Sequence, residues 1–287
     1  MTLIADSGST KTTWMEVESG NKVVTEGLNP HFTSDEAFLA ACATVRQHFP
    51  LSTFHFPLFF YGAGCGSEAQ KERVKALLFK AFGTSDIHVE TDMLGACRAV
   101  CGRDNGLVGI LGTGSNACYY DGDRIALQAV STGYILGDQG SANHLGRRLL
   151  QDYLSGLMPR NISGRFHEAY PQSREEFLEA VYHRPNANRF LASLAKFAVE
   201  HIDDDYCSSE ILISLYEWYS YQLEALQKLS FCDRLYLVGG FAARIRPLLD
   251  IVAKDKGLEI MTVLADPIDG LRKYHTDDSY SSANFAN

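Results

Sequence analysis

Two short segments rich in glycine and hydroxyl side chains occur in the same context, far apart in the chain. The first covers residues 3–12 and the second residues 109–116. Each follows an apolar strand-like run and leads into a second one, and a turn signal such as Asp121-Gly122-Asp123 then introduces a third. Such turns suit phosphate oxygens, because glycine lets backbone amides approach an anion and Ser or Thr adds donors. The repeat predicts that a nucleotide binds between two related halves of the protein.

Charged side chains flank the first of these turns. Asp6 ends the first strand-like run, where its carboxylate could hold Mg²⁺ through water, since Mg²⁺ prefers hard oxygen ligands. The alternative is an aspartate that only caps the turn by accepting backbone amides. Because the second turn repeats the first, we favour the metal role. Lys11 could pair with a phosphate or could be an ordinary exposed lysine, and the sequence does not separate the two.

Two further aspartates stand where the chain passes between elements. Asp92 follows a strand-like run and precedes a helical one, a position from which α/β proteins often project catalytic groups. An aspartate there is frequently only a helix N-cap, and both roles can hold, because helix N-terminal amides keep a carboxylate ionised. Asp138 lies in a glycine-rich loop, where it could cap the next helix with Ser141 or accept hydroxyl protons of a polyhydroxyl ligand.

Other signals are weaker. Gly239-Gly240, after an apolar strand-like run, allows the backbone to approach a flat ligand such as adenine, or merely permits strand-to-helix packing. Cys97 and Cys101 share a helix face, but buried thiols explain them better than a metal or cluster site. The sequence contains no HExxH, nucleophile elbow or Walker-type GxxxxGK[ST] pattern.

Composition describes an ordinary globular protein. The chain has 287 residues, of which 46% are hydrophobic and 21% are charged, and its net charge is −9. The acidic balance argues against a nucleic-acid or membrane-surface partner. No signal peptide is evident, and no apolar run approaches the ~20 residues that cross a bilayer. Seven cysteines without paired CxxC spacing suggest reduced thiols in a cytoplasmic protein.

Strands alternate with helices in the first half, which predicts an α/β architecture. The second half begins with the repeated hairpin and then becomes mostly helical. Two βββαβα-like lobes fit this order, with 1–106 and 271–287 in the N-terminal lobe and 107–270 in the C-terminal lobe. Helices are predicted over 34–49, 67–83, 93–101, 141–154, 187–201 and 208–229 and from Ser173, whose Glu176 completes a capping box, and later strands at 57–61, 87–90, 235–238 and 258–263.

These motifs, in this order, resemble the N-acetylglucosamine kinases and related BadF-type ATPases of the actin–hexokinase superfamily. The resemblance covers nearly the whole chain, and its most specific parts are Gly-Thr-Gly-Ser-Asn at 112–116 and Gly-Asp-x-Gly-Ser-Ala at 137–142. Segment 27–32 is one residue shorter than the vertebrate pattern, which leaves open whether Asn29 or His31 meets the sugar. Gln139 stands where an acidic residue is common.

The resemblance implies two ribonuclease H-like lobes with a cleft between them and a helical insertion in the second. It also implies an ATP- and Mg²⁺-dependent kinase that phosphorylates the 6-hydroxyl of an amino sugar, N-acetylglucosamine before glucosamine or N-acetylmuramic acid, and acts as a homodimer. An ATPase activator of a CoA-dependent dehydratase and a non-catalytic sugar sensor are the alternatives. The implied roles are catalytic base for Asp92, metal site for Asp6, nucleotide contacts for Gly8, Ser9, Thr10, Lys11, Gly112, Thr113, Gly114, Gly239 and Gly240, and sugar contacts for Asn29, His31, Asn116, Gly133, Tyr134 and Asp138.

Overall fold

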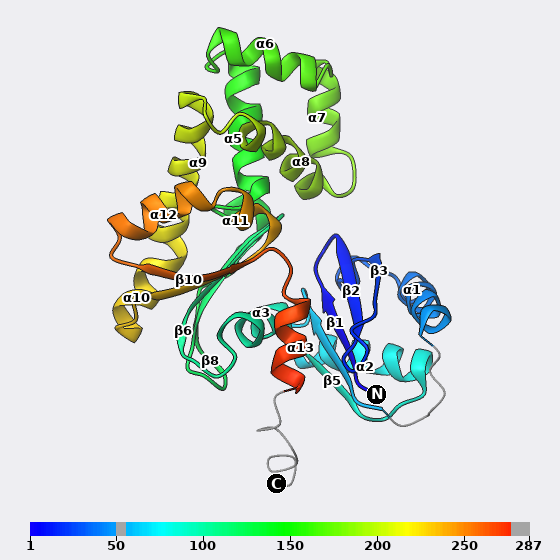
Figure 1. Cartoon of the computed structure of the whole chain (residues 1–287). Helices are drawn as coiled ribbons and strands as arrows, with labels where there is room; N and C mark the ends of the chain where they lie inside the picture. The colour runs from blue at the N-terminus through cyan, green and yellow to red at the C-terminus, as the bar shows by residue number, and fades with distance from the viewer. Residues whose placement is uncertain (50–55, 277–287) are drawn as a thin grey trace. The chain divides into compact units, whose positions relative to one another are not determined.

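The computed structural model describes residues 1–49 and 56–276, which form two compact units (Figure 1). The first consists of Met1–Asp104 with the described chain from Asp266, and the second of Asn105–Ala265. Each unit is built on a five-stranded mixed sheet, which confirms the α/β class. The expectation that residues 277–287 join the N-terminal lobe falls outside the described residues.

The sheet of the first unit combines a meander with two parallel strands, in the order β3-β2-β1-β4-β5. β1 (Leu3–Ser7) pairs antiparallel with β2 (Lys11–Glu16), and β2 pairs antiparallel with β3 (Lys22–Glu26). On its other side β1 pairs in parallel with β4 (Leu58–Gly62), which pairs in parallel with β5 (Ile87–Thr91). Parallel neighbours need crossover connections, and helices supply them.

Alternate residues of β1 face two different cores, because successive side chains of a strand point to opposite faces. Leu3 and Ala5 join the core that α1 (Asp35–His48) and α2 (Glu68–Phe82) complete, whereas Ile4 joins a smaller cluster with residues of α13 (Ile268–Thr276) and α3 (Asp92–Cys101). The predicted Ser67 N-cap and Gly83 C-cap of α2 are confirmed.

The second unit repeats the strand order of the first. Its sheet runs β10-β9-β6-β7-β8, so the antiparallel meander β6-β7-β8 corresponds to β1-β2-β3, and the parallel strands β9 and β10 correspond to β4 and β5. The predicted duplication is therefore confirmed. The strands are β6 (Gly106–Leu111), β7 (Ser115–Tyr120), β8 (Ile125–Gln128), β9 (Arg234–Val238) and β10 (Glu259–Leu264).

A helical insertion separates β8 from β9, drawn in green to yellow in Figure 1. The capping box of Ser173 and Glu176 is confirmed. A π turn interrupts the helix predicted over 208–229. The helices α4 and α6, whose bounds follow, were not predicted. The insertion comprises α4 (Gly133–Leu136), α5 (Ala142–Ser155), α6 (Arg160–Ala169), α7 (Arg174–Tyr182), α8 (Ala187–Glu200), α9 (Asp205–Trp218), η1 (Tyr219–Leu223) and α10 (Glu224–Ser230), and α11 (Gly240–Arg244) and α12 (Arg246–Asp255) follow β9.

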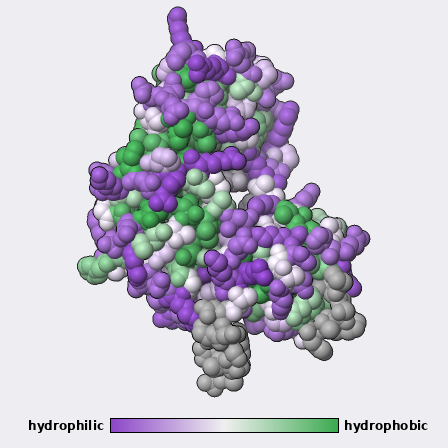
Figure 2. Space-filling view, viewed as in Figure 1, coloured by the Kyte–Doolittle hydropathy of each residue, from purple (hydrophilic) through white to green (hydrophobic). Residues whose placement is uncertain are grey.

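The face shown in Figure 2 is largely hydrophilic, and its hydrophobic residues form several separate groups. Among residues 1–49 and 56–276, no helix combines the length and the apolar character needed to cross a bilayer.

Two exposed glycines of the insertion offer a test of its backbone. Gly156 ends α5 at a φ of +69°, whereas Gly164 lies inside α6, and a Cβ at either position meets no atom of the described residues within 4 Å. Gly156→Ala should lower the free energy of unfolding by about 1 kcal/mol, because only glycine adopts the left-handed region without strain. Gly164→Ala should raise it by about 0.5–1 kcal/mol. Urea unfolding measures both, and equal signs would contradict this assignment.

Candidate active-site residues

Asp6 and Asp92 lie at the same edge of the first unit's sheet. Ser7 pairs with Gly62, and Gly62 pairs with Thr91, so β1, β4 and β5 end in register. The carboxyl ends of parallel strands form the edge at which open α/β sheets bind ligands. The two aspartates therefore stand on either side of β4 at the edge where a ligand is expected.

The start of α3 decides between two sequence interpretations of Asp92. The N-cap is Thr91, whose Oγ1 accepts a hydrogen bond from the Leu94 N–H at 3.2 Å. Asp92 is the first helical residue, and its Oδ1 accepts from the Met93 N–H at 2.9 Å. The interpretation of Asp92 as the N-cap is therefore wrong by one residue, because the threonine before it already provides the cap.

Burial raises the pKa of both carboxyls. The pKa of Asp6 rises to about 7, chiefly through burial and then through the charges of Asp266 and Asp92, while Lys11 acts in the opposite direction. The pKa of Asp92 rises to about 6 through burial, against the lowering effect of the backbone N–H groups of Met93 and Asp92. At neutral pH Asp92 is then largely ionised, yet it is a stronger base than an ordinary aspartate.

The donor set at this edge suits a hydrated Mg²⁺ ion. The charges of Asp266 and Asp92 disfavour ionised Asp6, and a divalent cation would relieve that repulsion. Within the described residues, however, no three His, Cys, Asp or Glu side chains are arranged to hold a metal directly. Mg²⁺ commonly keeps several waters and uses one or two carboxylates with substrate phosphates, so the residues fit that mode of binding.

The first glycine turn is fixed from both sides. The Gly8 N–H donates to the Lys11 carbonyl at 3.0 Å, and the Gly27 N–H donates to the Thr10 carbonyl at 3.1 Å. Beneath the turn the buried hydroxyls of Ser7 and Thr12 lie 2.8 Å apart. Both hydroxyls are thus used to hold the turn.

Lys11 forms an ion pair with Asp266, a residue that the sequence analysis did not single out. Its Nζ donates to Asp266 Oδ2 at 2.6 Å, although the lysine is more than half exposed. The other carboxylate oxygen of Asp266 accepts from the Ile268 N–H at 3.1 Å, at the start of α13. The only sequence signal for Asp266 was an aspartate after the last strand, and nothing in the pattern linked it to the first turn.

Asn29 and His31 occupy different environments. Asn29 is buried, and its Oδ1 accepts from the His31 N–H at 3.0 Å, whereas His31 is exposed. The same oxygen lies so close to Gly64, just after β4, that a Cβ there would come within 2.3 Å of it. Asn29 is therefore held beside the carboxyl edge. Arg73 secures the segment by donating to the Pro30 and Thr33 carbonyls.

In the second unit, the second glycine turn is tied to the loop of Asp138. The Asn143 side-chain amide donates to the Thr113 carbonyl at 2.6 Å and to Asp138 Oδ2 at 2.8 Å. The Ser115 N–H donates to Asp138 Oδ1 at 3.3 Å. Burial raises the pKa of Asp138, although these donors lower it. Asp138 thus lies beside the turn 112–114, with both carboxylate oxygens hydrogen-bonded.

Ser141 alone caps α5, by accepting from the His144 N–H at 3.2 Å. The interpretation of Asp138 as a shared cap is therefore wrong, because its carboxylate turns toward Ser115 and Asn143 instead.

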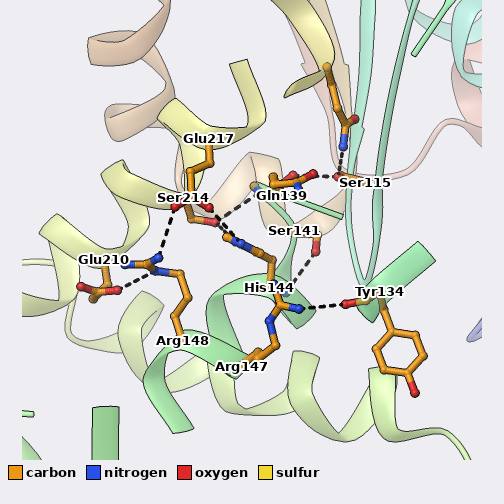
Figure 3. Close-up of polar contacts among 12 residues, drawn as sticks. Ser115, Tyr134, Gln139, Ser141, His144, Arg147, Arg148, Glu210, Ser214 and Glu217 are labelled. Carbon is orange, nitrogen blue, oxygen red and sulfur yellow. Dashed lines mark hydrogen bonds and ion pairs between the residues drawn. The ribbon is translucent and has the colours of Figure 1, made fainter. Parts of the chain in front are cut away.

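The remaining predicted residues of this unit fall around the same turn or near it. Gly239 has a φ of +136°, and a Cβ there would lie 2.1 Å from the Leu111 carbonyl oxygen, directly before the turn. Gly240 opens α11, and Asn116 accepts from the Ala117 N–H through its own side chain at 2.9 Å. Gly133 and Tyr134 begin α4, and the Tyr134 carbonyl accepts from Arg147 (Figure 3).

No disulfide joins the seven cysteines, all of which lie in described residues, and six of them are buried. Burial raises the pKa of the Cys42, Cys65 and Cys207 thiols to about 12, so these thiols stay protonated.

No protein-family model and no curated protein sequence matches the chain. Solved structures do match. A Porphyromonas gingivalis protein provisionally assigned as an N-acetylglucosamine kinase is 35% identical, with a TM-score of 0.89 over 96% of this chain and 98% of that one. A Chromobacterium violaceum protein with the same provisional assignment is 17% identical, with a TM-score of 0.73 over 96% and 99% of the two chains.

A more distant match is a ROK-family glucokinase from Streptomyces griseus, in complex with glucose and AMPPNP. It is 15% identical, with a TM-score of 0.54 over 95% of this chain and 97% of that one. Below 25% identity such matches establish the fold alone, and they confirm the expected two-lobe fold of the sugar kinases.

The raised pKa of Asp6 predicts how its removal changes stability with pH. The folded chain keeps a proton on Asp6 up to about pH 7, whereas the unfolded chain loses it near 3.8. The stability that this proton contributes is therefore complete below pH 3.8 and is lost as the pH rises through 7. Asp6→Asn avoids that loss, so its Tm relative to wild type should increase by a few degrees between pH 4.5 and pH 8.

Thermal unfolding at the two pH values measures this gain. Asp269→Asn, which alters an exposed aspartate of the same unit paired with Lys22, is the control. A gain for Asp6→Asn that does not grow with pH would contradict the assigned pKa.

Proposed function

Because the chain belongs to the N-acetylglucosamine kinase family of sugar kinases, we propose that it transfers the γ-phosphoryl group of ATP to the 6-hydroxyl of N-acetylglucosamine. One observation carries the mechanism: Asp92 stands half-buried at the carboxyl edge of the first sheet, with its pKa raised to about 6. A carboxylate of that basicity accepts the proton of a sugar hydroxyl as the hydroxyl attacks. Asp92 is the proposed general base.

Phosphoryl transfer depends on positioning and on stabilising charge, with little covalent work for the protein. In the first unit, we propose that Gly8, Ser9, Thr10 and Lys11 contact phosphate oxygens. Their turn is already fixed by the hydrogen bonds of Gly8 and Gly27, so little ordering is left for the ligand to cause. Lys11 would exchange its bond to Asp266 for one to phosphate.

In the second unit, the proposed nucleotide contacts are Gly112, Thr113 and Gly114, with Gly239 and Gly240 beside adenosine. The close approach of Gly239 to Leu111 supports this grouping, because it places the start of α11 next to the turn. Backbone N–H groups at such a turn suit an anionic ligand.

We propose that Asp6 holds Mg²⁺ through water. When bound, Mg²⁺ neutralises phosphate charge and orients the transferring group. The carboxyl of Asp6, whose pKa neighbouring aspartates raise, would be ionised by the cation and would then accept hydrogen bonds from its waters.

For the acceptor sugar, the proposed contacts of the second unit are Asn116, Gly133, Tyr134 and Asp138. Asp138 suits sugar hydroxyls because a carboxylate accepts their protons well. In the first unit Asn29 is better placed than His31, since its side chain is buried beside the carboxyl edge and that of His31 is exposed.

We also propose that the enzyme is a homodimer of the cytoplasm. The absence of disulfides among the described cysteines fits a reducing compartment, and the resemblance to the superfamily supports the dimer.

Asp92→Asn should reduce kcat about 10²–10⁴-fold, because the amide cannot accept the proton. Its affinity for AMPPNP, measured by calorimetry, should stay near that of wild type. Glu90→Gln, the same chemical change at a residue of β5 that pairs with Lys71, is the matched control and should retain most of its kcat. A kcat close to wild type in Asp92→Asn would falsify the assignment of the base.

A panel of acceptors tests the substrate. ADP release, measured by a coupled assay, should be fastest with N-acetylglucosamine and slower with glucosamine and N-acetylmuramic acid, and ³¹P NMR should show a 6-phosphate. EDTA should stop turnover and Mg²⁺ should restore it. Preference for another amino sugar would replace the proposed acceptor. ADP release that does not depend on any sugar would contradict the kinase.

A further inference from the structure

The loop of residues 137–141, called here the Asp138 loop, adopts a backbone that needs support. Asp138 has a φ of +57°, in the left-handed region that costs a non-glycine residue about 1–2 kcal/mol. Such conformations persist where the surrounding structure holds them, and they cluster at functional sites. Much of that support comes from the helical insertion.

Ser214 of α9 holds one side of the loop. Its Oγ accepts from the Gly140 N–H at 3.2 Å, and Ser214 is buried. Trp218, one turn later, fills the space beneath the loop so closely that a Cβ on Gly140 would lie 2.5 Å from the Trp218 Cβ. Gly140 itself has a φ of +78°. The loop therefore rests on one face of α9.

A buried histidine fixes the Ser214 hydroxyl (Figure 3). His144 Nδ1 lies 2.8 Å from Ser214 Oγ, and its Nε2 lies 3.1 Å from Glu217 Oε2. Burial lowers the pKa of His144 to about 4, so the ring is neutral. Its one proton is on Nε2, because the Glu217 carboxylate only accepts, and Nδ1 then accepts from Ser214. The Ser214 oxygen is thereby oriented to accept from Gly140.

Gln222 holds the other side of the loop through Ser115. Its Nε2 donates to Ser115 Oγ at 2.8 Å, and Ser115 Oγ donates to the Gln139 carbonyl at 2.7 Å. The Ser115 N–H also donates to Asp138. Gln222 is buried, and its Oε1 has no hydrogen-bond partner among the described residues. A buried amide oxygen without a partner costs stability, and the bond to Ser115 is the one hydrogen bond of the Gln222 side chain among the described residues.

The π turn brings Gln222 to this position. In a regular α-helix, at about 100° per residue, Gln222 would lie about 80° around the axis from Ser214. The segment η1 instead contains an i→i+5 hydrogen bond from the Glu224 N–H to the Tyr219 carbonyl. A π turn rotates less per residue than an α-helix, so η1 brings Gln222 closer in angle to Ser214. Both side chains can then reach the Asp138 loop.

We propose that Ser214 and Gln222 are positioning residues, which set the Asp138 loop in the geometry that receives the acceptor sugar. The proposal rests on the proposed function in one respect, the contact of Asp138 with sugar. It assigns a role in acceptor recognition to the helical insertion, through the π turn.

The test compares Gln222→Leu and Ser214→Ala with Gln227→Leu. Gln227 is the matched control, because it lies in the same insertion and bonds instead to the Tyr219 hydroxyl and the Lys256 carbonyl. Hydrogen exchange of the peptide that covers residues 137–141 should become faster in the first two variants and stay unchanged in the control. The KM for sugar should rise about 5–10-fold, the effect of one lost hydrogen bond, while the KM for ATP stays within about twofold.

Stability separates positioning from a merely structural role. Gln222→Leu removes an unsatisfied buried oxygen, so its Tm should not fall below that of Gln227→Leu. Unchanged exchange of residues 137–141 in both variants would overturn the proposal, as would equal increases in the two KM values. If the wild-type protein phosphorylates no sugar, the proposed function fails, and the exchange of the ligand-free protein still decides whether Ser214 and Gln222 hold the loop.

Discussion

Burial of carboxylates at one sheet edge is the constraint on which the first unit depends. Ionised Asp6 and Asp92 are disfavoured there by desolvation, and Asp6 also by its acidic neighbours, so the fold must offset this cost elsewhere. The two apolar clusters on either face of β1 provide the offset. The same burial raises the pKa of both carboxyls and so makes them stronger bases than ordinary aspartates.

The second unit has the same strand order but must hold irregular loops in place. Its turn 112–114 and the Asp138 loop are irregular backbone, which a sheet alone does not hold. The insertion between β8 and β9 supplies buried hydrogen-bonding side chains from α9 and η1 to support them. The geometry of the Asp138 loop therefore depends on side chains that are remote from it in sequence.

Most regular elements could be predicted, since their signals are local. The two ends of α2 are marked by Ser67 and Gly83, and the start of α7 is marked by Ser173 with Glu176. These caps form as expected. Two predictions failed because a neighbour competed for the same role: Thr91 caps α3 in place of Asp92, and Ser141 caps α5 without Asp138. The π turn escaped prediction, because the phase shift from a single extra residue is too local to stand out in the hydrophobic pattern of a long helix.

The sequence by itself determined the two glycine turns, the repeated hairpin, the strand-end positions of Asp6 and Asp92, and the family. Those features depend on residue type and short spacing, which the chain displays directly. Only the tertiary structure decided that Asp266 meets Lys11 and that Gln222 meets Ser115. The residues of such pairs are distant in sequence and come together only when the helices and strands pack. The raised pKa values of Asp6 and Asp92 likewise follow from the burial that this packing creates.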